Sequence, residues 1–79
     1  MRILDEQRDC SVARVTILLT RAEAEELRDA LESVLANWRG NHAHVPSEDW
    51  QKEITVALYD VNTIDTFHER YQRLILEDI

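Results

Sequence analysis

The chain has 79 residues and a net charge of −7, from 16 acidic and 9 basic side chains. This length accommodates a single domain over residues 1–79, and an apolar content of 44% is typical of a globular protein, which argues against disorder. A negatively charged surface repels phosphate backbones, so the charge disfavours nucleic-acid binding. Such a charge could attract a basic protein partner, or it could serve only to keep the protein soluble.

The single cysteine, Cys10, cannot form a disulfide within the chain. A chain this short buries only about 60% of its unfolded surface, so either hydrophobic packing alone or a homodimer could stabilise it, and both alternatives stay open. No apolar run approaches the ~18 residues that span a membrane, and the charged N-terminus lacks the apolar core of a signal peptide. With one free cysteine, these features predict a cytoplasmic protein with no membrane contact.

The first 19 residues are predicted to form a hairpin. Residues 2–8 alternate poorly but could make a short strand, and Asp9, Cys10 and Ser11 are typical of a turn. Residues 12–19 alternate better, with Val15, Ile17 and Leu19 on one face, which favours a second strand.

A helix is predicted to begin at Thr20. Thr20 and Glu23 have the spacing of a capping box, in which each side chain accepts a hydrogen bond from the other residue's backbone amide. Gly40, the only glycine, stands where a left-handed C-cap is expected, and Trp38 is assigned to the core. The apolar stripe of this helix comprises Ala24, Leu27, Leu31, Val34 and Leu35.

A second hairpin is predicted over residues 42–59. Its first strand, His42–Val45, stops at Pro46, a residue that suits a strand end or a sheet edge, and its loop carries Trp50. Its second strand covers residues 53–59. Ile54, Val56 and Leu58 share one face of that strand, and Thr55, Ala57 and Tyr59 share the other.

A second helix is predicted to begin at Asn62 or Thr63 and to run nearly to the chain end. Its apolar stripe comprises Ile64, Phe67, Tyr71, Leu74 and Ile75. The predicted fold class is therefore α+β in the order ββαββα, with a four-stranded, mainly antiparallel sheet and both helices packed on one face. In this fold Leu27, Leu31, Val34, Phe67, Tyr71 and Leu74 belong to the core.

The side of the first helix opposite its stripe is acidic. We expect Arg21 and Arg28 to pair with Glu25 and Glu32, which leaves the remaining acids on this side, Glu26 and Asp29, without a helical partner. Such a ridge could bind a basic protein, or it could be an ordinary solvated face.

Three further partner-binding candidates, Glu48, Asp49 and Trp50, stand together in the loop of the second hairpin. A loop tryptophan between polar residues can anchor an interface, or it can fold back over the core of a small domain. Tyr59 would stand on the sheet face away from the helices. If that face is uncovered, it presents an apolar patch to a partner.

His42 and His44 are the most site-like pair, because residues two apart on a strand point to the same face. They could bind a metal or a small ligand with a third group such as His68, Glu48 or Asp49, or they could be half-exposed histidines of an edge strand. No metal ligand, cofactor or catalytic residue is assigned. Because no nucleophile motif or glycine-rich loop is present, we expect a binding protein rather than an enzyme.

In size, acidity and α+β build the chain resembles the immunity proteins of bacterial toxin systems. The local residues behind this resemblance are the strand-like segments His42-Ala43-His44-Val45 and Glu53-Ile54-Thr55-Val56. The resemblance implies a small inhibitor that binds and blocks a cognate toxin, and it carries no functional residue over to this chain.

Overall fold

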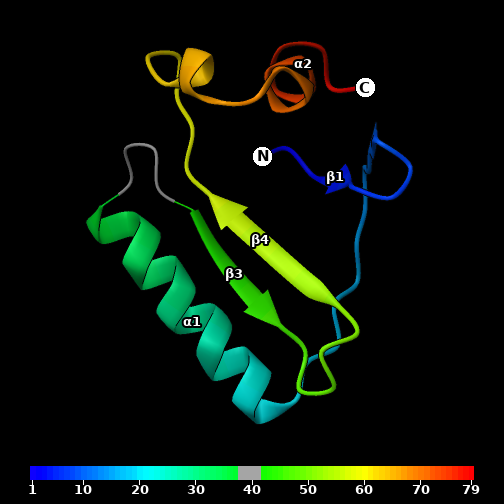
Figure 1. Ribbon diagram of the computed structural model, residues 1–79, viewed down its shortest axis with the longest axis vertical. Coiled ribbons are helices and arrows are strands. Elements are labelled where there is room, and N and C mark those ends of the chain that lie inside the picture. The colour runs from blue at the N-terminus through cyan, green and yellow to red at the C-terminus, as the bar shows by residue number, and fades with distance from the viewer. Residues whose placement is uncertain (38–41) are drawn as a thin grey trace. The chain divides into compact units, whose positions relative to one another are not determined.

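A computed structural model describes residues 1–37 and 42–79 and shows an α+β chain with two small antiparallel sheets (Figure 1). The chain divides into two compact units: unit 1 comprises residues 1–17 and 60–79, and unit 2 comprises residues 18–59. No helix of the described residues combines the length and the apolar character needed to cross a bilayer. The elements are β1 (Leu4–Asp5), β2 (Cys10–Ser11), α1 (Arg21–Ala36), β3 (His42–Pro46), β4 (Glu53–Ala57), the 3-10 helix η1 (Ile64–Thr66) and α2 (Glu69–Glu77).

Unit 2 consists of α1 packed on the two-stranded ribbon of β3 and β4. The capping box is confirmed: Thr20 Oγ1 accepts a hydrogen bond from the Glu23 amide at 3.2 Å, and Glu23 Oε1 accepts one from the Thr20 amide at 2.9 Å. Both amides would otherwise lack a partner in the first turn of the helix. The sequence therefore places the start of α1 correctly.

The second hairpin is also confirmed, since β3 and β4 pair antiparallel with His44 opposite Thr55. On β4, Ile54 and Val56 are half-buried, whereas Thr55 and Ala57 are exposed, as the alternation predicts. The buried face of the ribbon lies on α1, and its outer face is open to solvent.

The predicted core stripe of α1 is only partly right. Val34 is fully buried and Leu27 is half-buried, but 43% of Leu31 and 65% of Leu35 remain exposed. Two strands about 4.8 Å apart cover less of a helix about 10 Å wide than the predicted four-stranded sheet would. Ala30, which the stripe omits, is buried instead. The predicted C-cap at Gly40 and the core position of Trp38 lie outside the described residues.

The predicted opening hairpin has the wrong register, and residues 13–19 belong to no strand. Asp5 Oδ1 accepts hydrogen bonds from the amides of Gln7 and Arg8, and the Asp9 amide donates to the Asp5 carbonyl. This places the turn at residues 6–9, so Cys10 and Ser11 form β2 rather than a turn. The single four-stranded sheet is therefore wrong: the strands form two separate ribbons.

The predicted ββαββα order is also wrong, because η1 stands between β4 and a shorter second helix. Thr66 Oγ1 donates to the Thr63 carbonyl at 2.6 Å, and Phe67 is extended, with φ −88° and ψ 155°. His68 then caps α2 by accepting from the Arg70 amide at 3.3 Å. Of the predicted core on this segment, Leu74 and Ile75 are buried, and Phe67 and Tyr71 are half-buried.

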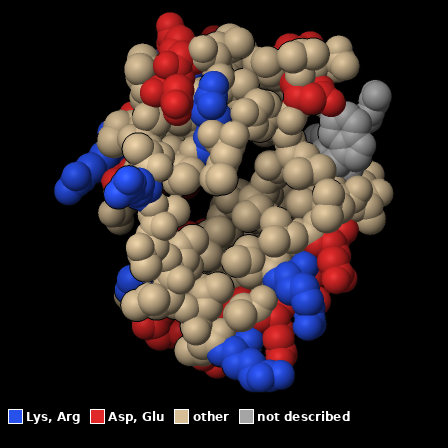
Figure 2. All heavy atoms as spheres, turned by 180° about the vertical axis from the view of Figure 1, so that it is seen from behind, with Lys and Arg blue, Asp and Glu red and all other residues tan. Residues whose placement is uncertain are grey.

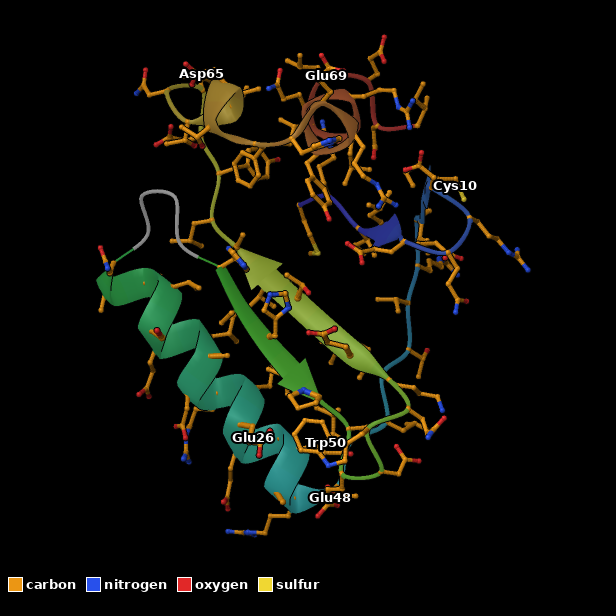
Figure 3. The ribbon with its side chains drawn as sticks, viewed as in Figure 1. Cys10, Glu26, Glu48, Trp50, Asp65 and Glu69 are labelled. Carbon is orange, nitrogen blue, oxygen red and sulfur yellow. The ribbon has the colours of Figure 1, made fainter. Side chains whose placement is uncertain are left out.

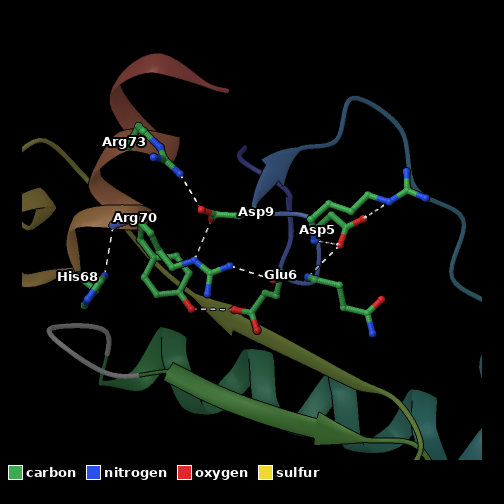
Figure 4. Close-up of polar contacts among 9 residues, drawn as sticks. Asp5, Glu6, Asp9, His68, Arg70 and Arg73 are labelled. Carbon is green, nitrogen blue, oxygen red and sulfur yellow. Dashed lines mark hydrogen bonds and ion pairs between the residues drawn. The ribbon is translucent and has the colours of Figure 1, made fainter.

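Within unit 1, one carboxylate joins the β1–β2 turn to α2 (Figure 4). Asp9 accepts hydrogen bonds from Arg70 Nε at 3.0 Å and from Arg73 Nη2 at 2.9 Å. These contacts, that of Arg73 first, lower the pKa of the Asp9 carboxyl below its ordinary value of 3.8, against a smaller opposing effect of desolvation. The residue also has a positive φ of 55°, a conformation that Asp and Asn tolerate better than most residues.

The Asp9→Asn variant should therefore unfold more easily than the wild type at neutral pH. A carboxyl whose pKa is lowered on folding stabilises the fold above its unfolded pKa, and this contribution is lost as the pH falls through the folded pKa. The difference between the two proteins should thus be present at pH 7 and shrink below about pH 4, as urea denaturation at each pH would measure. A difference that stays constant down to acid pH would contradict this prediction, because it would show that the charge of the Asp9 carboxylate is not its source.

Candidate protein-interaction site

Trp50 stands on the loop between β3 and β4 with 79% of its surface exposed. Its backbone φ is 62°, in the left-handed region. Hairpin loops of this kind usually place Gly at such a position, because a side chain there costs about 1–2 kcal/mol. The loop therefore displays its largest apolar side chain to solvent in a strained backbone conformation. An outlier of this kind motivates a functional hypothesis.

Hydrogen bonds within the loop hold this conformation. The Trp50 amide donates to the Ser47 carbonyl at 3.0 Å, which closes a turn, and the Ser47 amide donates to the Lys52 carbonyl at 2.8 Å. Ser47 Oγ donates to Asp49 Oδ1 at 2.6 Å and accepts from the Lys52 amide at 3.0 Å. Asp49 Oδ1 also accepts from the Gln51 amide at 3.0 Å. The hydrogen bonds from Ser47 first, then from Gln51, lower the pKa of the Asp49 carboxyl.

Glu23 fastens this loop to the start of α1. While its Oε1 accepts from the Thr20 amide, its Oε2 accepts from the Glu48 amide at 2.8 Å. The same two backbone contacts, that of Thr20 first, lower the pKa of the Glu23 carboxyl. Sequence reasoning identified the helix cap but missed the link to Glu48, because that contact joins residues 25 positions apart.

The end of unit 2 that carries Trp50 is rich in carboxylates. Glu26 on α1 and Glu48 on the loop are exposed and lie near this end of the unit (Figure 3). Along α1, Arg21 pairs with Glu25 at 3.2 Å, as predicted. On the face seen in Figure 2, acidic and basic side chains likewise lie beside one another. Residues 18–59 contain eight acidic and four basic side chains, a net charge of −4.

Two of the predicted partner-binding residues do not belong to this site: Tyr59 lies apart from it, and the charge of Asp29 is partly neutralised. Tyr59 follows the far end of β4, whereas Trp50 precedes its beginning, so the strand lies between the two aromatic residues. Asp29 accepts a hydrogen bond from Arg28 Nε at 3.1 Å. Arg28 therefore pairs with Asp29 and not with Glu32, the partner predicted from the sequence. The structure thus brings together four predicted residues: Glu26, Glu48, Asp49 and Trp50.

An open depression adjoins Trp50 on the outer face of the ribbon. Its polar wall is formed by His44 and Glu53, whose Nδ1 and Oε1 atoms lie 2.7 Å apart. His44 Nδ1 also lies 2.9 Å from Thr55 Oγ1, so cross-strand neighbours already occupy this nitrogen. The residues that line the depression are His44, Pro46, Trp50, Gln51, Lys52 and Glu53.

His42 and His44 do share one face, with ring centroids 4.9 Å apart and the rings edge to face. Among the described residues, however, no group of three or more His, Cys, Asp or Glu side chains is arranged to hold a metal ion. Two of the three further ligands considered from sequence have other contacts: His68 caps α2, and Asp49 accepts hydrogen bonds within its own loop. Cys10 is exposed on β2.

Comparison with known proteins finds no matching family model, no matching curated protein and no matching solved structure.

Proposed function

We propose that this protein is a small protein-interaction module that binds a basic partner through Trp50 and the carboxylates around it. The observation that carries the proposal is the exposed Trp50 side chain on a loop with a left-handed backbone. Tryptophan is enriched among the residues that dominate binding energy at interfaces. A loop already held in one conformation also loses less entropy on binding.

The charge around Trp50 supports a basic partner. Glu26 and Glu48 are exposed at this end of the unit, and the whole chain carries −7. Complementary charge accelerates association and selects against acidic partners, whereas a central aromatic side chain slows dissociation. An inhibitor or immunity-type role is the specific form that we propose. A toxin gene next to this one, with its product bound at Trp50, would support that form.

Affinity capture with paired baits tests the proposal. Wild type and Trp50→Ser would be incubated with the same native cell extract, and the captured proteins compared by quantitative mass spectrometry. We expect at least one basic protein that the wild type retains and Trp50→Ser loses. Val61→Ser is the matched control, since Val61 is 84% exposed but lies in unit 1. Equal capture by all three baits would contradict the proposal.

The captured partner then tests the role of charge. Glu26→Lys with Glu48→Lys should slow association severalfold, and added salt should slow the wild type toward the rate of this variant. Arg21→Ala is a useful comparison, because it removes a nearby positive charge and should not slow association. Rates that respond to neither salt nor charge reversal would remove the basic partner from the proposal while leaving Trp50 as its anchor.

A further inference from the structure

Residues 13–19 have the composition of a strand but no strand partner in the described chain. Val15, Ile17 and Leu18 are 54%, 47% and 90% exposed, and β-branched residues are enriched in sheets. The segment lies outside every helix and strand (Figure 1). The backbone hydrogen bonds of the described residues outside helices and strands include none from these amides. The apolar side chains and the backbone groups of this segment are therefore available for pairing.

The ribbon of unit 2 presents an edge that such a segment could join. The Ser47 amide donates to the Lys52 carbonyl, and hydrogen-bonded pairs recur at every second position of an antiparallel ladder, so Val45 and Ile54 form the next such pair. The backbone groups of the residues on either side of Ile54, Glu53 and Thr55, therefore point away from β3. Strand β3 ends in Pro46, which lacks an amide hydrogen and so protects the edge of that strand. Charged residues and proline usually protect a strand edge, and in β4 Glu53 alone is of these kinds.

We infer that two copies of this chain exchange strands, with residues 14–19 of each copy pairing with the free edge of β4 in the other. A second copy can satisfy both elements at once, because in a two-fold dimer each copy supplies one segment and one edge. Charge agrees with this pairing: the segment's single charged residue is Arg14, and that of β4 is Glu53.

The size of unit 2 also favours a dimer. It has 42 residues, and the buried apolar side chains among its described residues are Ala30, Val34 and Val45. Units near this size usually need a disulfide, a metal or an oligomeric partner, and a two-stranded ribbon gains stability from additional strands. This inference does not depend on Trp50, which lies on the loop before β4 rather than along its edge.

Sedimentation velocity over a range of concentrations tests the inference, together with amide hydrogen exchange. We expect a monomer–dimer equilibrium, with exchange at residues 14–19 and at Thr55 slowing as the dimer forms. Since each copy carries −7, added salt should strengthen the dimer, whereas it should weaken binding to a basic partner. A monomer at every concentration, or a dimer without protection of these amides, would overturn the inference.

Thr55→Pro provides the specific variant, because it removes an amide that points away from β3. Its dissociation constant should rise about a hundredfold, since two-fold symmetry repeats the loss at both contacts and each is worth about tenfold. Thr55→Ala retains the amide and should still form the dimer. Leu18→Asp should weaken the dimer from the segment side without disturbing a residue that packs within the unit. Far-ultraviolet circular dichroism confirms that each variant is folded, and a dimer unaffected by both changes would rule out this pairing.

Discussion

Replacing Trp50 by Gly is expected to stabilise the fold and to abolish most binding to the captured partner. Gly adopts a φ of 62° without the cost of about 1–2 kcal/mol that other residues incur. Part of this gain, roughly 0.5–1 kcal/mol, is offset because Gly loses more conformational entropy than other residues when the chain folds. Because Trp50 is 79% exposed, its removal costs little packing. The free energy of unfolding should rise by about 0.5–1 kcal/mol, whereas affinity should fall about 30-fold or more.

Trp50→Ala separates the two effects. Alanine removes the indole but keeps the Cβ atom, so it should lose affinity as glycine does and gain no relief of strain. Urea denaturation of both variants measures stability, and surface plasmon resonance against the captured partner measures affinity. If glycine instead lowered stability relative to alanine, the left-handed backbone would not be strained at Trp50, and the main argument for a functional loop would be lost.

The parts of the fold that could be predicted from sequence are those governed by local signals. The capping box at Thr20 and the hairpin around Trp50 depend on residues close in the chain, and both are confirmed. The strand predicted over residues 12–19 failed because alternation describes a segment's preference and not its partner. The Asp5 side chain accepts hydrogen bonds from two amides, which closes the turn earlier in the chain than the apolar pattern indicates. Without a four-stranded sheet to cover them, Leu31 and Leu35 on the predicted stripe of α1 remain exposed.

The candidate site shows the same limit. Trp50 and its acidic neighbours could be selected from the sequence, because exposed loop aromatics are uncommon and carry binding energy. The left-handed backbone of Trp50 could not be predicted, since residue type alone favours Gly or Asn there. The contact of Glu23 with the Glu48 amide joins a helix to a distant loop. In contrast, the spacing of Ser47 and Asp49 is a known turn signal, so this part of the network was accessible from sequence.

Val34→Ala is expected to lower the free energy of unfolding by about 2 kcal/mol. Val34 is fully buried between α1 and the ribbon, and the substitution removes two methyl groups at about 0.8 kcal/mol each and leaves a cavity. In a chain of 79 residues this is a large fraction of a total stability of about 5–10 kcal/mol. The midpoint of urea unfolding, followed by circular dichroism, should therefore shift markedly with little change in slope.

Leu35→Ala is the matched control on the same helix. Leu35 is 65% exposed, and alanine has the higher helix propensity, so the monomer should change by less than about 0.5 kcal/mol. An effect as large as that of Val34→Ala in dilute, monomeric protein would instead mean that the full stripe of α1 is buried, as the four-stranded sheet required.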